Sequence, residues 1–233
     1  VRAITTTALT GLTTAQVAAL TSTQIGALTS TQAAALNTAQ AAAIETTDLS
    51  AMSTASVRAL TTAAVNALGT DQIAVLTTAQ VSALSTTQVQ ALTTAHVAAL
   101  TTADVASMTS AQVAALSSTQ AAAIETTDIS QFNTTNVRAL STTAITGLDT
   151  AQIAALNTAQ VNALTSTQSA ALNTAQAAAL ETGDISQLTT AALRTLSTAA
   201  VNALGTNQIA ALTTAQVVAL ATTQVQALTT AQV

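Results

Sequence analysis

The stretch LTTAQVAAL, residues 12–20, returns with small edits along the whole chain, for example as LTTAQVSAL at residues 76–84. A step of eight residues from Ile4 to Leu228 reaches 29 positions, and every one of them is large and apolar. The residues other than Leu at these positions are Ile4, Ile44, Met52, Met108, Ile124 and Phe132. Because no insertion or deletion breaks the period, the sequence predicts units of fixed length that stack on one another.

We letter each eight-residue unit, or octad, from a to h, with the large apolar residue at a. Position b is Thr, Ser, Asn, Asp or Gly, except at Ala221 and at three Glu residues, and these five residue types are the preferred helix N-caps. Position e is Gln in 17 octads, so b and e form the Thr-x-x-Gln pattern of a capping box. Position f is Val, Ile, Leu or Ala except at Ser169, so a and f match the two residues of a hydrophobic staple.

This pattern predicts an all-α fold, namely a solenoid or superhelix of very short capped helices with one helix in each octad. Each helix is expected to have one and a half to two turns and to end near the next cap residue. Helices this short are marginal in water on their own. Most of the stability is therefore expected to come from burying positions a and f against neighbouring units, with Thr and Gln facing outward.

Other repeat folds fit the pattern less well. In one straight helix, eight residues advance about 80° beyond two full turns, so the Leu residues would line no fixed face and a coiled coil would not form. A β-solenoid is the alternative, because Thr and Val suit strands and cap residues also suit turns. Positions a and f have opposite parity, however, and would point to opposite faces of one strand.

A longer repeat lies above the octad, since residues 1–97 align with residues 137–233 at an offset of 136. We interpret this offset as an internal duplication. Residues 1–233 are expected to form a single continuous octad-repeat array. Because the sequence starts and stops inside the repeat pattern, we expect the chain to be a fragment of a longer one.

Composition excludes several functional classes. The four basic residues are all Arg against nine acidic residues, so the chain lacks the positive surface expected for nucleic-acid binding. Phe132 is the only aromatic residue of the Phe, Trp and Tyr class, which leaves no platform for stacking bases. The absence of Cys excludes a disulfide framework. Thr and Ser interrupt every apolar run, so no membrane-spanning segment is expected.

Charged residues recur as a set. The stretches IETTDLSAM, IETTDISQF and LETGDISQL, at residues 44–52, 124–132 and 180–188, place Glu at position b and Asp at position e. Each is followed in the next octad by an Arg. The three sets are Glu45, Asp48 and Arg58; Glu125, Asp128 and Arg138; and Glu181, Asp184 and Arg194. Two carboxylates are few for calcium, which takes six to eight oxygen ligands. The other interpretation is that Arg58 pairs with Glu45 or Asp48 and fixes the register between coils or chains.

The sequence gives no candidate catalytic, cofactor-binding or metal-binding residue. His96 is the only His and stands at position e, where a capping role in place of Gln is expected. Without Cys and with one His, the usual ligands of a zinc site are missing. We therefore expect neither an enzyme nor a small-molecule substrate.

The tandem motif L-[TS]-[TS]-A-Q-[VI]-x-A resembles the repeat regions of very large bacterial surface or secreted proteins, of the repeat-adhesin or S-layer type. This resemblance implies an extracellular or cell-surface structural segment, such as a stalk, fibre or filament. Few charges and many small residues also suggest self-association or lateral packing of copies. The alternative function is an adhesive or ice-binding surface of Thr rows, for which the T-x-T run at residues 21–23 is an example.

Overall fold

The computed structural model describes residues 3–233, and its regular structure in that range consists of 28 short α-helices with no strand. This arrangement confirms the predicted all-α solenoid and excludes the β-solenoid for the described residues. The helices have four to six residues, slightly fewer than predicted. They end early because the N–H at position a turns back to the carbonyl at position f, as from Leu28 to Ile25 at 3.1 Å.

The backbone divides into two compact units, the first ending at Ala115 and the second running from Leu116 to Val233. The first contains α1 (Thr6–Thr10), α2 (Thr14–Ala18), α3 (Ser22–Gly26), α4 (Ser30–Ala35), α5 (Thr38–Ala42), α6 (Thr46–Leu49), α7 (Thr54–Ala59), α8 (Thr62–Asn66), α9 (Thr70–Ala74), α10 (Thr78–Ala83), α11 (Thr86–Ala91), α12 (Thr94–Ala98), α13 (Thr102–Ser107) and α14 (Ser110–Ala114).

The second unit contains α15 (Ser118–Ala122), α16 (Thr126–Ile129), α17 (Thr134–Ala139), α18 (Thr142–Gly147), α19 (Thr150–Ala154), α20 (Thr158–Ala163), α21 (Ser166–Ala171), α22 (Thr174–Ala178), α23 (Thr182–Ile185), α24 (Thr190–Thr195), α25 (Thr198–Asn202), α26 (Thr206–Ala210), α27 (Thr214–Ala219) and α28 (Thr222–Gln226).

Most helices begin at the predicted capping box, and α4 is an example. The Thr29 side-chain oxygen accepts a hydrogen bond from the backbone N–H of Gln32 at 3.3 Å, while the Thr29 N–H donates to Gln32 Oε1 at 2.9 Å. The Val, Ile, Leu and Ala side chains at f and the large apolar ones at a are mostly buried. Exceptions lie in the first and last turns, where for example Val217 and Val225 are exposed. Capping and burial therefore form each helix as the octad predicts.

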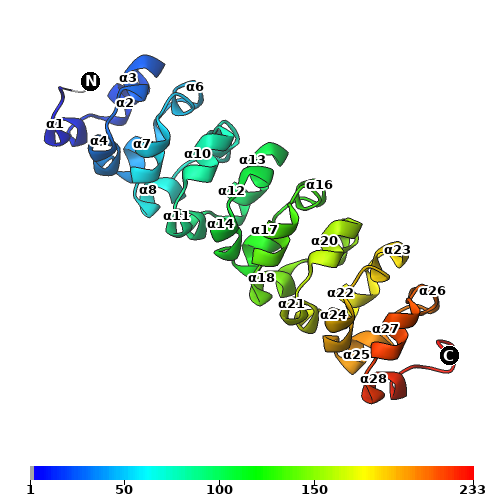
Figure 1. Ribbon diagram of the computed structural model, residues 1–233. Helices are drawn as coiled ribbons and strands as arrows, with labels where there is room; N and C mark the ends of the chain where they lie inside the picture. Colours follow the sequence, from blue (N-terminus) through cyan, green and yellow to red (C-terminus); the bar gives the residue numbers. More distant parts are fainter. Residues whose placement is uncertain (1–2) are drawn as a thin grey trace. The chain divides into compact units, whose positions relative to one another are not determined.

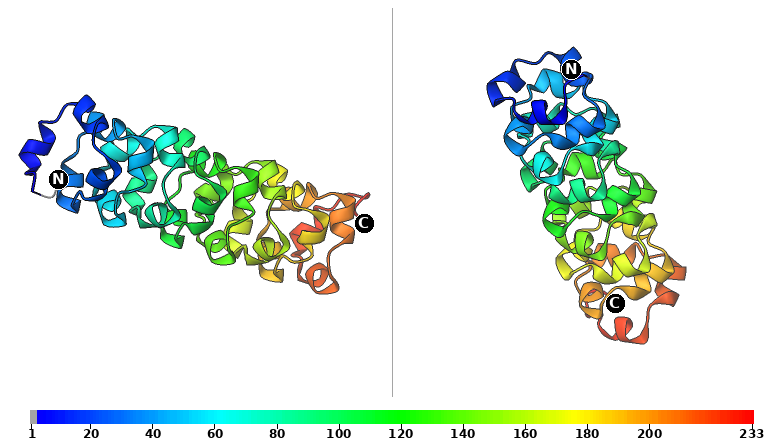
Figure 2. Two further views of the ribbon diagram at one scale, coloured as in Figure 1. Left: turned by 90° about the horizontal axis from the view of Figure 1, so that it is seen from above. Right: turned by 90° about the vertical axis from the view of Figure 1, so that its left-hand side faces the viewer.

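Within each unit, the helices that pack against each other are three apart in sequence. In the first unit α4 packs against α7, and in the second α15 packs against α18 and α21 against α24. One turn of the coil therefore takes three octads. Figure 1 and Figure 2 show these turns stacked within each unit, with the same arrangement repeated from one turn to the next.

Candidate functional site

The Gln at position e links one turn of the coil to the turn before it. In α11, Gln88 Oε1 accepts a hydrogen bond from the Ser85 N–H at 2.8 Å. Its Nε2 donates to the carbonyl oxygens of Val57 at 3.0 Å and Leu60 at 2.8 Å, at the end of α7. A single amide thus satisfies main-chain groups at the start of one helix and at the end of another, where helices leave such groups without partners.

This bridging bond recurs throughout both units. The Gln residues whose Nε2 donates to the carbonyls 28 and 31 residues earlier are Gln40, Gln72, Gln80, Gln88, Gln112, Gln152, Gln160, Gln168, Gln176, Gln208, Gln216, Gln224 and Gln232. The repeated bonds fix the register of each turn on the next.

The prediction that Gln faces outward is wrong. Gln32, Gln40 and the other buried Gln side chains at position e are only 1–6 % exposed. The capping box uses the amide oxygen and leaves two N–H donors. Buried carbonyls at helix ends need such donors, and therefore the side chain turns inward rather than to solvent.

Other residues at position e keep part of this role. His96 Nδ1 accepts from the Thr93 N–H at 3.3 Å, and its Nε2 lies 2.8 Å from the Leu68 carbonyl oxygen, 28 residues earlier. The expected capping role of His96 is thus confirmed, with a bridge in addition. Asp104 accepts from the Thr101 N–H at 3.1 Å and from its hydroxyl at 2.6 Å. As a carboxylate, Asp104 has no donor for the preceding turn.

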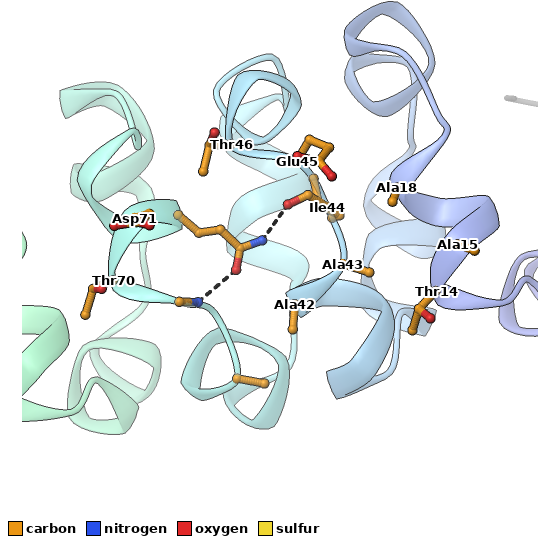
Figure 3. A pocket seen from close by; sticks show the side chains of 13 residues that line it. Thr14, Ala15, Ala18, Ala42, Ala43, Ile44, Glu45, Thr46, Thr70 and Asp71 are labelled. Carbon is orange, nitrogen blue, oxygen red and sulfur yellow. Dashed lines mark hydrogen bonds between the residues drawn. The ribbon is translucent and has the colours of Figure 1, made fainter.

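A groove of about 680 Å³ crosses three successive turns of the first unit. Figure 3 shows its labelled side chains: Thr14, Ala15 and Ala18 from one turn, Ala42 to Thr46 from the next, and Thr70 with Asp71 from the third. Ala67, Gly69 and Gln72 complete the lining. Gln72 Nε2 donates to the Ile44 carbonyl at 2.7 Å beside the groove, so a bridging bond holds its two walls together. Five of the thirteen lining residues are Ala, and Glu45 brings a carboxylate to the lining.

The second unit has the equivalent groove, of about 440 Å³. Its lining residues are Ala178, Ala179, Leu180, Glu181, Thr182, Gly205, Thr206, Asn207 and Gln208. The internal duplication relates every one of them to a residue that lines the first groove, as it relates Glu181 to Glu45 and Gly205 to Gly69. The sequence duplication has therefore produced two copies of one surface feature.

A glycine lines each groove, and neither the backbone conformation nor the packing at that position requires glycine. Gly69 and Gly205 are N-caps with φ of −77° and −70°, which any residue adopts. A Cβ there would meet only the Oε1 atoms of Gln72 at 3.9 Å and Gln208 at 3.6 Å, both ordinary contacts. Because glycine has no side chain, α9 and α26 also lack a side-chain cap. Each groove thus lies at an N-cap position that lacks the stabilising side-chain hydroxyl of Ser or Thr.

A Glu at position b does not by itself require a glycine at position b three octads later. Gly69 follows Glu45 by three octads, and Gly205 follows Glu181 by the same interval. In the third copy of the set, the residue three octads after Glu125 is Asp149. Asp149 caps α19 in the usual way, accepting from the Gln152 N–H at 2.7 Å.

The two carboxylates of each charged set behave differently. Asp48 accepts a hydrogen bond from the Ser22 hydroxyl at 2.5 Å, and Asp184 accepts one from the Thr158 hydroxyl at 2.6 Å, each 26 residues earlier. The Glu residues at position b are exposed and provide no side-chain cap to their helices; these are Glu45, Glu125 and Glu181. Asp48 and Asp184 are thus held within the coil, whereas the Glu side chains remain at the surface.

Within the described residues of one chain, Arg58 does not pair with Glu45 or Asp48. Arg58 Nη1 donates to the carbonyl of Ala83 at 3.3 Å, 25 residues later, and Arg138 Nε donates in the same way to Ala163. Arg58 and Arg138 are both at position g of their octads. A side chain at g lies next to a carbonyl at the end of a helix in the following turn, so each Arg bonds to that later turn and not to the carboxylates of its own set. Asn66 makes the same type of bond to Ala91 at 2.7 Å.

Residues 3–233 contain no group of three or more His, Asp or Glu side chains placed to hold a metal ion, so the calcium interpretation of the paired carboxylates gains no support. In the same residues, no helix has both the length and the apolarity needed to cross a membrane.

The family model of the ALTTAQ repeat matches six segments of this chain, namely residues 1–30, 41–78, 75–102, 121–158, 148–182 and 177–214. No curated protein and no solved structure matches the chain. The letters ALTTAQ correspond to positions h to e of the octad, and therefore include the buried Leu, the cap and the bridging Gln. With these segments covering well over half of its length, the chain belongs to the ALTTAQ repeat family.

Proposed function

We propose that the chain is a structural, non-enzymatic repeat segment that forms part of an extended stalk, fibre or filament in a very large bacterial protein. The observation that carries this proposal is the bridging Gln, which repeats the same turn-to-turn bonds throughout both units. Such bonds allow length to grow by addition of turns without a change in local geometry.

The packing supports the same function. Within a unit, helices pack against neighbours three before and three after them, so each turn depends on adjacent turns only. In repeat proteins of this kind, stability is approximately a sum of the terms for each repeat and its nearest neighbours. A long array is then no less stable per repeat than a short one, as a spacer requires.

We place this segment outside the cell or at the cell surface. The support is the resemblance to bacterial surface repeats, together with an acidic composition without Cys or Lys. Detection of the native protein on intact cells with an antibody, before and after surface proteolysis, tests this placement. Labelling that appears only after the cells are permeabilised would contradict it.

Insertion of one complete turn tests the structural function. A tandem copy of residues 69–92 adds three octads in register and should increase the maximum dimension measured by small-angle X-ray scattering, with unchanged helicity per residue. The matched control copies only residues 89–92, which add half an octad and displace every later cap and bridge. An insertion of three octads that leaves the maximum dimension unchanged would contradict the proposal.

A second candidate, an adhesive or ice-binding surface, is favoured by one observation. Position c is Thr or Ser in all 29 octads, although the cap itself is at b. Thr54 and Thr78, on the packed helices α7 and α10, are exposed. The run at residues 21–23 is a poorer example, because Thr21 and Ser22 donate to Gln24 and Asp48. Absence of thermal hysteresis would remove the ice-binding alternative.

A further inference from the structure

The Glu and Arg residues of the three charged sets are left without ionic partners by the fold. Within residues 3–233, no ion pair joins an Arg to Glu45, Glu125 or Glu181. Arg138 uses only its Nε, so both of its Nη groups remain available, and the Arg194 side chain makes no hydrogen bond within the described residues. Yet in all three sets the Glu at position b is followed by an Arg at position g of the next octad.

The grooves beside Glu45 and Glu181 suit a guanidinium group. Ala42 and Ala43 in one groove, and Ala178 and Ala179 in the other, give apolar surface for the methylene stem beside the Glu carboxylate, and glycine places no side chain at the opening. Arg can bind a carboxylate through two parallel hydrogen bonds while its stem packs on apolar surface. Both grooves also offer a second hydrogen-bond acceptor for the guanidinium at the same position. It is a side-chain oxygen of Asp71 in one groove and of Asn207 in the other.

We propose that these two grooves receive Arg side chains of a second copy of this chain. The proposal rests on the structural function above and names its partner. Charge complementarity selects the occupant, since Arg is the only basic residue type in the chain apart from one His. The internal duplication relates Arg58 to Arg194 just as it relates Glu45 to Glu181, so it has copied both halves of the contact together. Within residues 3–233 of one copy neither half has an ionic partner, and a neighbouring copy pairs them.

Two variants with several substitutions each test the contact by charge exchange. E45R/E181R reverses the charge of both grooves and R2E/R58E/R138E/R194E reverses that of every Arg, so neither variant should associate with itself through the grooves. Mixed in equal amounts, they should associate with each other. Sedimentation velocity over a concentration series at low ionic strength provides the measurement, and circular dichroism of each variant verifies the fold. Failure of two folded variants to associate when mixed would overturn the proposal.

A second test fills the groove without a change of charge. G69S/G205S adds a cap hydroxyl to α9 and α26, and should raise thermal stability while it lowers the association constant about tenfold or more. The control is A221S, which adds a cap to α28 away from both grooves and should raise stability only. Equal association of G69S/G205S and the wild-type chain would show that another surface mediates contact.

Ionic strength and shape complete the test. Association of the wild-type chain should weaken strongly when salt is raised, because exposed charge pairs are screened over about 10 Å at 0.1 M. A wild-type chain that stays monomeric at every concentration at low salt would overturn the inference. The proposed spacer function would survive that result if the monomer still lengthened on insertion of residues 69–92, so the two failures are distinguishable.

Discussion

Helices α18 and α20 of the second unit meet the preceding turn in different ways. Gln160 of α20 donates to the carbonyls of Ile129 at 2.9 Å and Phe132 at 2.8 Å in the preceding turn. In α18 the equivalent residue is Ala144, and a Cβ on Gly147 would overlap the backbone of Ser118 in α15. The octad therefore permits two contacts between turns, one bridged by hydrogen bonds and one made by direct backbone packing.

The two contacts show that length and turn-to-turn approach are determined by different positions. Positions a, b and f fix where each helix starts and what it buries, and they have the same roles in α18 and α20. Positions e, g and h decide how closely one turn approaches the next. An octad can change its bridging residue without a change in length, which explains how 29 octads vary in sequence without a single insertion.

Removal of a bridge should have the largest effect. The substitution Gln160→Leu keeps the approximate size but leaves the buried carbonyl of Phe132 and the N–H of Asn157 without their partner. The Ile129 carbonyl loses one of its two donors and keeps the Phe132 N–H. We expect a loss of about 3 kcal/mol, since each buried polar group left unpaired costs roughly 1–3 kcal/mol. Urea denaturation followed by circular dichroism measures it. The control is Gln24→Leu, where an exposed Gln bonds only within its own helix start, so a similar loss there would refute the bridge.

Obstruction of the direct contact should have the next largest effect. The substitution Gly147→Ala places a methyl group against the Ser118 carbonyl, and the two backbones must separate. Overpacking of this kind typically costs about 1–3 kcal/mol. Gly183→Ala is the matched control, because nothing lies within 4 Å of its Cβ and its helix should gain about 0.5–1 kcal/mol. Both changes are read from urea midpoints, and opposite signs are expected.

The sequence is sufficient to predict each helix but not the way the helices stack. Thr29 and Gln32 form the predicted capping box because both residues lie within one octad, and local rules apply to them. The number of octads in a turn depends on the angle between successive helices, which no single octad encodes. The bond from Gln88 to Leu60 therefore escapes prediction, because it joins residues 28 apart.

The grooves escape prediction for the same reason. In the sequence, Glu45 is recognisable as an unusual residue at b, and Gly69 is an ordinary variant among the caps. They become neighbours only when the turn is known to contain three octads. With that knowledge, the signal is a Gly at position b three octads after a Glu at position b, and it occurs in both halves of the duplication.

Two buried serines should respond in opposite directions. Ser169 has no hydrogen-bond partner for its buried hydroxyl, whereas Ser56 Oγ donates to the Leu28 carbonyl at 2.8 Å, a bridge that replaces that of Gln. Ser169→Ala should stabilise the second unit by about 1.5 kcal/mol, because an unsatisfied buried hydroxyl is removed. Ser56→Ala should destabilise the first unit by a similar amount. A loss for Ser169→Ala would contradict the unsatisfied hydroxyl, and a gain for Ser56→Ala would contradict the bridge.

The smallest effect is expected where half of a bridge is already present. Asp104 accepts a hydrogen bond from the Thr101 N–H, as a Gln at position e would. It cannot donate to the carbonyl of Leu76, the residue 28 positions earlier to which a bridging Gln would donate. Asp104→Gln should add that bond and remove a charge that is 1 % exposed, with a gain of about 1 kcal/mol. Asp104→Glu has the length of Gln without the donor, so it isolates the bridge from the added methylene. Equal urea midpoints for the Gln and Glu variants would mean that turns of this coil are held together by packing alone.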